Sequence, residues 1–338
     1  MTIPPSALVG SSLLRCGVGF LLLDSTKLIT LSHRVAGFHG LMPGSISSPL
    51  YNCFRSRSML HPAFRAAGVA TAKHQTVTTA DPARALAFAA ESGYPVSVYP
   101  LRHRRSAPQT GDLVGAEALS TALDALAQRG IETVSVEQRP PGERLRCLLQ
   151  LGKPLMAVRS PADSGSQAPY VHWDLSAMTR RDLEFLARVG RALPGLTVLD
   201  LEFTRRAGWR GGYTVVDATV VPRIGRYRAA GRAATRAAVD QIVSYELGVE
   251  LPDRSAGEIT TTVAMATDGP TDEKIGTELI RRLEKAGVRS GWHSDDSGTA
   301  WIVAKGEADD VATACVEVIA AYANDGPRLT CQPDAIRG

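Results

Sequence analysis

The chain has 338 residues, enough to bury a substantial core, and we expect two or three subdomains. Its apolar content of 44%, charged content of 21% and net charge of +4 are ordinary for a globular protein. Only six of the 38 basic residues are lysine, and this arginine bias does not by itself imply binding to nucleic acid, which we do not expect. The five cysteines are scattered without the spacing of metal ligands, which indicates free thiols in a reducing cytoplasm.

The chain begins with an apolar segment, residues 7–23, that Arg15 and several glycines interrupt. This segment has no basic leading region and is too short to span a membrane. We therefore interpret it as core strands and expect a cytoplasmic protein without a membrane partner. Residues 36–49 are rich in Gly, Pro and Ser and predict a long loop, of a length that often closes over a site.

The next part of the chain alternates between strand and helix patterns. Its expected strands are 18–24, 27–31, 69–77 and 96–100, and its expected helices are 59–67, 81–92 and 116–129. Gly68 is placed to end the first helix, and Thr79 or Asp81 to cap the second, which has Pro82 in its first turn. Residues 101–113 predict a polar, arginine-rich loop.

Residues 134–159 predict a β-meander of three short strands, with a turn at Pro140–Gly142 and a hairpin tip at Gly152. Glu137 closes the first strand and Arg146 lies on the second, an arrangement that suits a nucleotide lying against a sheet. The same pattern also fits an ordinary antiparallel sheet edge. Both interpretations stay open on the residues alone.

The C-terminal part of the chain continues with helices and strands. Asp174 or Ser176 is placed to cap a helix that runs to Arg191. Strands are expected at 196–203 and 213–221, and a helix at 232–247. Residues 256–338 have the order strand, helix, strand, strand, helix, strand, which predicts a ferredoxin-like βαββαβ module. Such modules bind small ligands or pair protomers, so a homodimer through this module is one expectation.

Several short sequence segments, taken together with this order of elements, resemble a known superfamily. They are Ala66–Val69, Glu91–Pro100, Val136–Gly142, Arg146 with Gly152–Lys153, Leu196–Asp200 and Val216–Pro222. In this order and spacing they resemble the ATP-grasp superfamily, nearest to carboxylate–amine ligases of the cyanophycin synthetase and D-alanine–D-alanine ligase kind. The resemblance implies an α+β ATP-grasp fold with two subdomains around a cleft. We expect an N-terminal segment 1–54, an ATP-grasp-like domain 55–252 and the C-terminal module 256–338.

The resemblance implies a nucleotide site in which several positions depart from the family. Arg57 stands where the family has its first phosphate-binding lysine, and Tyr99 where it has its second, although a phenol supplies no positive charge. The loop that follows lacks the family's run of glycines and offers Arg104 instead. On the adenine side the candidate residues are Glu137, Gln138 and Pro140, with Arg144 in place of a ribose-binding carboxylate; Arg146 and Arg159 match arginines that face phosphate or substrate.

The resemblance also implies ATP and Mg²⁺ as cofactors. Asp200 matches the first metal ligand, Asp217 stands in place of a glutamate, and Thr219 in place of an asparagine. Arg223 replaces a glycine, and with Arg226 it would face an acyl-phosphate or a substrate carboxylate. The alternative is that these acids form ion pairs with neighbouring arginines.

Two functions are therefore predicted. The first is a divergent ATP-grasp carboxylate–amine ligase that joins an amino acid or peptide to an amine through an acyl-phosphate. The second is a catalytically impaired ATP-grasp pseudoenzyme that serves as a binding or assembly module. Departures at Tyr99, Arg144, Thr219 and Arg223, together with the loop without glycines, favour weak or absent ATP turnover. Either function implies a small-molecule or peptide partner.

Overall fold

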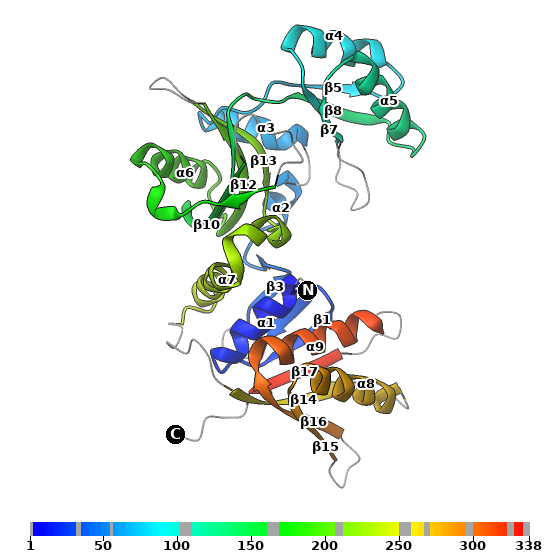
Figure 1. The fold of residues 1–338 in the computed structure, drawn as a ribbon, viewed down its shortest axis with the longest axis vertical. Helices are drawn as coiled ribbons and strands as arrows, with labels where there is room; N and C mark the ends of the chain where they lie inside the picture. The colour runs from blue at the N-terminus through cyan, green and yellow to red at the C-terminus, as the bar shows by residue number, and fades with distance from the viewer. Residues whose placement is uncertain are drawn as a thin grey trace. The chain divides into compact units, whose positions relative to one another are not determined.

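The computed structural model describes a mixed α+β protein. It covers residues 3–31, 35–54, 57–101, 110–160, 169–206, 212–249, 258–266, 271–294, 300–322 and 328–333. The chain forms two compact units, one made of Met1–Ser45 with Arg232–Gly338 and the other of Ile46–Gly231 (Figure 1). In the described part of the chain, no helix is both long and apolar enough to cross a membrane.

The first unit is built on one antiparallel sheet that joins both ends of the chain. Its strand order is β15-β16-β14-β17-β1-β2-β3-β4. The strands are β1 (Phe20–Asp24), β2 (Lys27–Thr30), β3 (Gly37–His39), β4 (Met42–Pro43), β14 (Glu258–Ala266), β15 (Arg289–Ser294), β16 (Ala300–Glu307) and β17 (Arg328–Pro333). The helices are α1 (Pro5–Arg15), α7 (Gly231–Leu247), α8 (Thr271–Lys285) and α9 (Ala308–Ala321).

The C-terminal elements from β14 to β17 follow the expected order of strands and helices, but they share their sheet with the start of the chain. Strand β17 pairs with β14 on one side and with β1 on the other, where Cys331 lies opposite Phe20. Because β1 covers this edge, the N-terminal segment and the C-terminal module form one body rather than the two expected domains. Pairing of protomers through the module stays a prediction.

The apolar start of the chain, for which the sequence predicts core strands, is a helix in its first part, and only its end forms a strand, β1. Helix α1 begins at Pro5, and its residues from Ser6 to Leu14 are all buried. A continuous apolar run reads alike as a buried helix or a buried strand, which explains the wrong prediction. Gly10 permits close packing, since a Cβ there would lie 2.9 Å from the ring of Phe20. The expected loop at 36–49 instead contains β3, β4 and the start of helix α2 (Ser48–Phe54).

The second unit contains two smaller sheets. The four-stranded sheet has the order β5-β8-β6-β7, and the five-stranded sheet has the order β11-β10-β9-β12-β13. The first is formed by β5 (His74–Thr78), β6 (Val96–Pro100), β7 (Thr110–Leu113) and β8 (Thr133–Gln138), with α4 (Pro82–Ser92) and α5 (Ala116–Ala127). The second is formed by β9 (Glu143–Gln150), β10 (Lys153–Ser160), β11 (Val171–His172), β12 (Val198–Arg205) and β13 (Tyr213–Thr219), with α6 (Arg180–Ala192). Helix α3 (Arg57–Ala66) precedes both sheets.

The predicted meander is divided between these two sheets. Strand β8 pairs with β5 and β6, whereas β9 and β10 pair with each other in the other sheet. At Pro140–Gly142 the chain thus passes from the four-stranded sheet to the five-stranded sheet. Gly142 has φ +120°, and a Cβ there would lie 2.4 Å from the carbonyl oxygen of Arg205, so only glycine fits this approach.

Helix caps fix the ends of the helices in this unit. Asp81 caps α4 by accepting the backbone N–H of Arg84 at 3.4 Å, as its sequence position predicts. Helix α6 is capped by Thr179, not by Asp174 or Ser176, in a capping box with Asp182. Asp174 instead accepts the N–H of Ser176 at 2.9 Å and starts a separate 3₁₀ turn, η1 (Leu175–Ala177).

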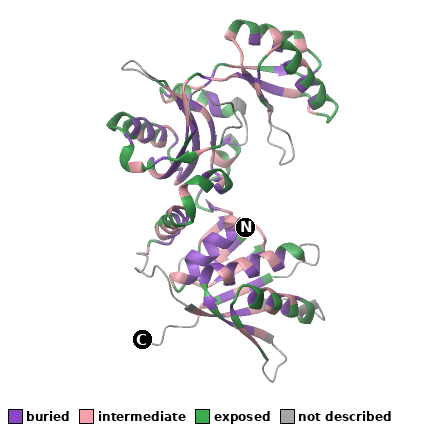
Figure 2. Ribbon diagram, viewed as in Figure 1, coloured by how far each residue is buried: buried purple, intermediate pink, exposed green. Residues whose placement is uncertain are grey.

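The two faces of the five-stranded sheet have different chemistry. On one face the ring of Phe203 on β12 lies 5.1 Å from that of Phe185 on α6, so this apolar face is covered by the helix. Side chains alternate along a strand, and Asp200 and Glu202 therefore point to the opposite face. Figure 2 shows buried residues along the strands of this sheet. This opposite face is polar but buried, and several of the predicted site residues lie on it.

Candidate functional site

Arg146 is the centre of the polar face. Its Nε and Nη2 donate to the two carboxylate oxygens of Asp200 at 2.8 and 3.1 Å. Its Nη1 donates to Oε2 of Glu202 at 2.8 Å, so one guanidinium bridges two acids of β12. Arg146 is 1% exposed and Asp200 is 0% exposed. The planar guanidinium matches the geometry of a carboxylate and forms two parallel hydrogen bonds with it. The ion pair is therefore rigid as well as charged.

The carboxylate of Asp200 has two further donors. The Tyr227 hydroxyl donates to Oδ1 at 2.7 Å, and the backbone N–H of Arg223 donates to Oδ2 at 2.9 Å. Both residues lie in or next to the 3₁₀ turn η2 (Ile224–Ala230). Burial raises the pKa of Tyr227 well above its usual value, and the charge of Asp200 raises it further, so the phenol keeps its proton. Asp200 thus accepts four hydrogen bonds and fixes η2 to the sheet.

Glu202 pairs with a second arginine. Nε and Nη2 of Arg144 lie 3.1 and 2.5 Å from Oε1 of Glu202, and Nη2 also donates to the Tyr170 hydroxyl oxygen at 3.3 Å. The pKa of Glu202 lies below its usual value: burial alone would raise it, but the charges of Arg146 and Arg144 outweigh the burial. Glu202 is therefore ionised at neutral pH.

The remaining predicted metal ligands lie beside these acids on β13. Thr219 is the strand partner of Asp200, and Asp217 is the strand partner of Glu202. Oδ2 of Asp217 lies 3.3 Å from Nη1 of Arg223, and its Oδ1 accepts the N–H of Ala218 at 2.9 Å. The Thr219 hydroxyl accepts the N–H of Val221 at 3.1 Å.

This donor set does not fit a magnesium ion in the arrangement described. A divalent cation of this kind needs oxygen atoms with free lone pairs, and both oxygens of Asp200 already accept two hydrogen bonds each. The carboxylates of Glu202 and Asp217 are also paired with arginine side chains. Among the described residues there is no group of three or more His, Cys, Asp or Glu side chains suited to a metal ion.

On the predicted adenine side, the backbone and side chains are tied into the fold. Oε1 of Glu137 lies 3.1 Å from Nε2 of His61 on α3 and accepts the Ser135 hydroxyl at 3.0 Å. The side chain of Gln138 donates to the carbonyl of Ser92, and its backbone N–H donates to that of Lys73. Pro140 is buried. The backbone N–H of Gln138 is therefore already engaged within the fold.

A stacked pair of imidazoles lies beside Glu137. The rings of His61 and His74 are 3.9 Å apart between centroids and 15° from parallel, and Nδ1 of His74 lies 3.2 Å from the carbonyl oxygen of Ala72. Burial lowers the pKa of His74 below its usual value of 6.5, and His61 and Arg65 lower it further against the opposing effect of Glu137.

This pair predicts a loss of stability in acid. Because the folded pKa of His74 lies below 6.5, the unfolded chain binds more protons once the pH falls below that value. We expect full stability above pH 6.5 and a decline below it, seen as a falling denaturation midpoint. The variant His74→Phe keeps a flat ring against His61 but does not titrate, so its midpoint is expected to fall less over the same range. Equal slopes for the two proteins would contradict this assignment.

The other predicted residues come from other elements of the second unit or from parts of the chain outside the described residues. Against the effect of burial, Tyr99 is close enough to raise the pKa of Arg144. Tyr99 is on β6 opposite Ser135, and Arg226 is exposed on η2. Arg159 on β10 has a side chain 47% exposed, with Nη1 3.4 Å from Glu143. Arg57 begins α3, but its side chain is not among the described parts, and Arg104 lies outside the described residues.

The structure thus brings Arg144, Arg146, Arg223, Asp200 and Asp217 together. The sequence interpretation missed Glu202, Tyr227 and Tyr170. The signal for Glu202 was present in the strand pattern, since Glu202 follows Asp200 by two residues, just as Arg146 follows Arg144. No pattern of comparable strength marks Tyr227, which reaches Asp200 from a turn.

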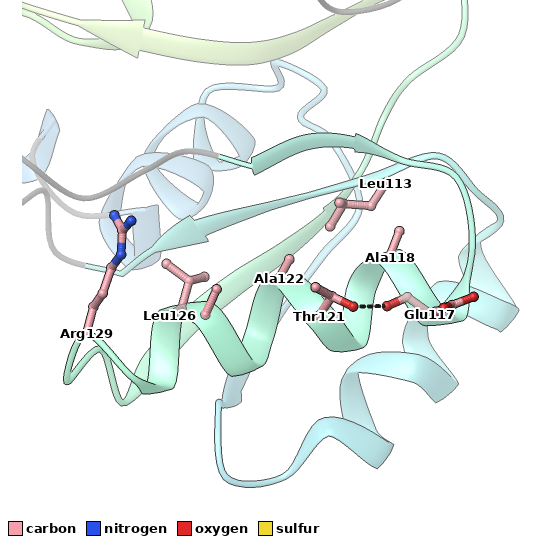
Figure 3. Close-up of a pocket in the computed structure, with 8 residues that line it drawn as sticks. Leu113, Glu117, Ala118, Thr121, Ala122, Leu126 and Arg129 are labelled. Carbon is pink, nitrogen blue, oxygen red and sulfur yellow. Dashed lines mark hydrogen bonds between the residues drawn. The ribbon is translucent and has the colours of Figure 1, made fainter.

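A separate groove of about 610 Å³ lies along α5. Its walls are largely apolar and include Leu113, Ala118, Ala122 and Leu126. Figure 3 shows Ala118, Ala122 and Leu126 along the helix and Leu113 apart from it, at the end of β7, with Glu117 near one end of the helix and Arg129 near the other. None of the predicted site residues lines it, so it is distinct from the ion-pair network.

Comparison with known proteins gives matches among solved structures only. No family model matches the sequence, and no curated protein is similar to it. The chain is similar to a RimK-domain ATP-grasp protein of Sphaerobacter thermophilus, with 16% identity over 59% of this chain and 69% of that chain and a TM-score of 0.45. It is also similar to the ATP-grasp ligase PsnB in complex with a minimal precursor, with 18% identity over 59% and 62% and a TM-score of 0.41.

A third match is N5-carboxyaminoimidazole synthase of Aspergillus clavatus in complex with ADP and 5-aminoimidazole ribonucleotide. It has 13% identity over 81% of this chain and 75% of that chain, with a TM-score of 0.46. The chain spans less than two thirds of the length of PsnB. Two of the three matches are described as ATP-grasp proteins.

Proposed function

We propose that this chain is a divergent ATP-grasp protein of the carboxylate–amine ligase type whose ATP turnover is weak or absent and which serves as a binding or assembly module. The observation that carries this proposal is the state of Asp200, whose carboxylate accepts four hydrogen bonds from its own chain. A ligase of this type needs that carboxylate for Mg²⁺, and the ion neutralises the charge that develops on the transferred phosphate.

Further features of the same region support the proposal. Arg144, which stands where a ribose-binding acid is expected, binds Glu202 and cannot accept a hydrogen bond from a sugar hydroxyl. Tyr99 supplies no positive charge for a phosphate. The backbone N–H of Gln138 donates to Lys73 rather than being free for a base. Each of these features weakens a different part of nucleotide binding, so the effects reinforce one another.

An active ligase remains the competing function, and turnover distinguishes the two. We expect purified protein with Mg-ATP and a mixture of amino acids and short peptides to release ADP at the rate of a blank without protein. Loss of a single cation from a phosphate clamp lowers turnover by about 10³–10⁵-fold in comparable enzymes. ADP release at the rate of an ordinary enzyme, on the order of 1 per second or faster, that depends on one amino acid or peptide would overturn the proposal and favour the ligase.

A further inference from the structure

The acids of the polar face are balanced by arginines of the same chain. The acids are Asp200, Glu202 and Asp217, and the arginines that pair with them are Arg146, Arg144 and Arg223. We name the three acids the acid cluster. Among the residues that the structure describes, these ion pairs join three negative and three positive charges within neighbouring strands and one turn. Buried charges need such compensation, because an isolated one costs several kcal/mol or more, about the stability of a whole domain.

Arg146 is the best placed of the three arginines to act as the counter-cation. It is 1% exposed, it lies on the central strand between β10 and β12, and its fork reaches two acids at once. By contrast, the side chain of Arg223 is 33% exposed and contacts Asp217 at 3.3 Å. A divalent cation held by Asp200 and Glu202 would need the same oxygen lone pairs that Arg146 uses. The guanidinium and such a metal ion therefore exclude each other.

We propose that the guanidinium of Arg146 is the resident cation of the acid cluster, in the place a divalent metal would take. The inference concerns the same site as the proposed function and deepens it, because it states why that site is closed. Two consequences follow. The folded wild-type protein needs no metal ion at the cluster, and a metal ion is accepted there once the guanidinium is removed.

The test compares thermal unfolding of three proteins in chelator and in millimolar MnCl₂. Wild-type protein is expected to have the same melting temperature in chelator and in MnCl₂. Arg146→Met leaves Asp200 and Glu202 without their shared cation, and we expect its melting temperature to fall by roughly 6–20 °C in chelator. Mn²⁺ should restore part of that fall. Arg146→Lys keeps a positive charge at the site, so we expect a smaller fall and no recovery with Mn²⁺.

Arg159→Met is the matched control, since it removes the same charge from the neighbouring strand at a half-exposed position. It should melt near wild type in both solutions. If Arg146→Met does not fold in chelator, its refolded yield with and without Mn²⁺ replaces the melting temperature, and the yield is expected to rise with the metal.

Three results would overturn the inference. Stabilisation of wild-type protein by Mn²⁺ would mean that the ion pairs open to admit a metal. Arg146→Met without any response to Mn²⁺ would mean that the acids are no cation site. Recovery of Arg146→Lys by Mn²⁺ would mean that charge is not what excludes the metal. ADP release at the rate of an ordinary enzyme by wild-type protein whose melting temperature ignores Mn²⁺ would overturn the proposed function alone.

Discussion

Replacing Asp200 by asparagine is expected to lower the free energy of unfolding by about 3–5 kcal/mol, the largest effect predicted for a single isosteric change. The amide keeps the shape of the carboxylate, but it loses the charge that Arg146 needs. A buried guanidinium is then left with only part of its compensation, from Glu202. The amide nitrogen also presents a donor where Tyr227 or Arg223 donates. The midpoint of chemical denaturation measures the loss.

Glu184→Gln is the control for this change, because it also neutralises an acid that pairs with arginine. Glu184 accepts from Arg180 at 2.8 Å on the exposed surface of α6. Pairs of this kind contribute about 0.3–0.5 kcal/mol, so the control should unfold almost as wild type does. If Asp200→Asn were no more destabilising than Glu184→Gln, the carboxylate of Asp200 would not be the structural hub that its four hydrogen bonds indicate.

Replacing Gly142 by alanine is the second large effect, and we expect it to cost about 2–4 kcal/mol. Gly142 has φ +120°, a region that residues with a Cβ rarely adopt. The added Cβ would lie 2.4 Å from the carbonyl oxygen of Arg205, which is backbone and has little room to move. The change disturbs the point where the chain leaves β8 and enters β9, so both sheets of the second unit are affected.

Gly130→Ala separates the two causes of that cost. Gly130 also has a positive φ, +69°, but nothing lies within 4 Å of its added Cβ. Its cost should be the backbone strain alone, about 1–2 kcal/mol. Thermal unfolding of the two variants side by side measures the difference. Equal losses would show that the close approach to Arg205 contributes nothing.

The sequence predicts most local elements because their signals are local. Asp81 before Pro82 and Gly68 after Ala67 mark a helix start and a helix end, and both are confirmed. The second strand expected within residues 134–159 is confirmed as β9. Pairing between strands is a different matter, since it depends on contacts across the chain. Nothing in residues 134–138 says that β8 pairs with β5 rather than with β9, so the place of the first strand of the meander was predicted wrongly, whereas the hairpin of β9 and β10 is confirmed.

The boundaries between units could not be predicted for the same physical reason. The pairing of Phe20 with Cys331 joins residues far apart in the chain. No change of composition in the sequence predicts this pairing. A Gly- and Ser-bearing stretch such as residues 36–49 has the composition of a loop even where two short strands form in it. Turn composition therefore predicted a loop where strands at the edge of the sheet form.

The candidate site was predicted in part. Asp200, Asp217 and Arg146 were singled out, and the structure brings them onto one face. The alternative that these acids pair with arginines was also open, and Arg223 is indeed bound to Asp217. What the sequence could not supply was the depth of burial. An arginine at 1% exposure is enclosed together with its partners, whereas the same residue at a surface would be available to a ligand.

The most direct test of this account is the electron paramagnetic resonance signal of free Mn²⁺ during titration with wild-type protein. Since the oxygens of Asp200 and Oε2 of Glu202 accept from Arg146, and Oε1 of Glu202 accepts from Arg144, the free signal is expected to stay constant at every protein concentration. A decrease in proportion to added protein, reversed by excess Mg²⁺ and absent from Asp200→Asn, would show that the acid cluster holds a metal and would contradict the account.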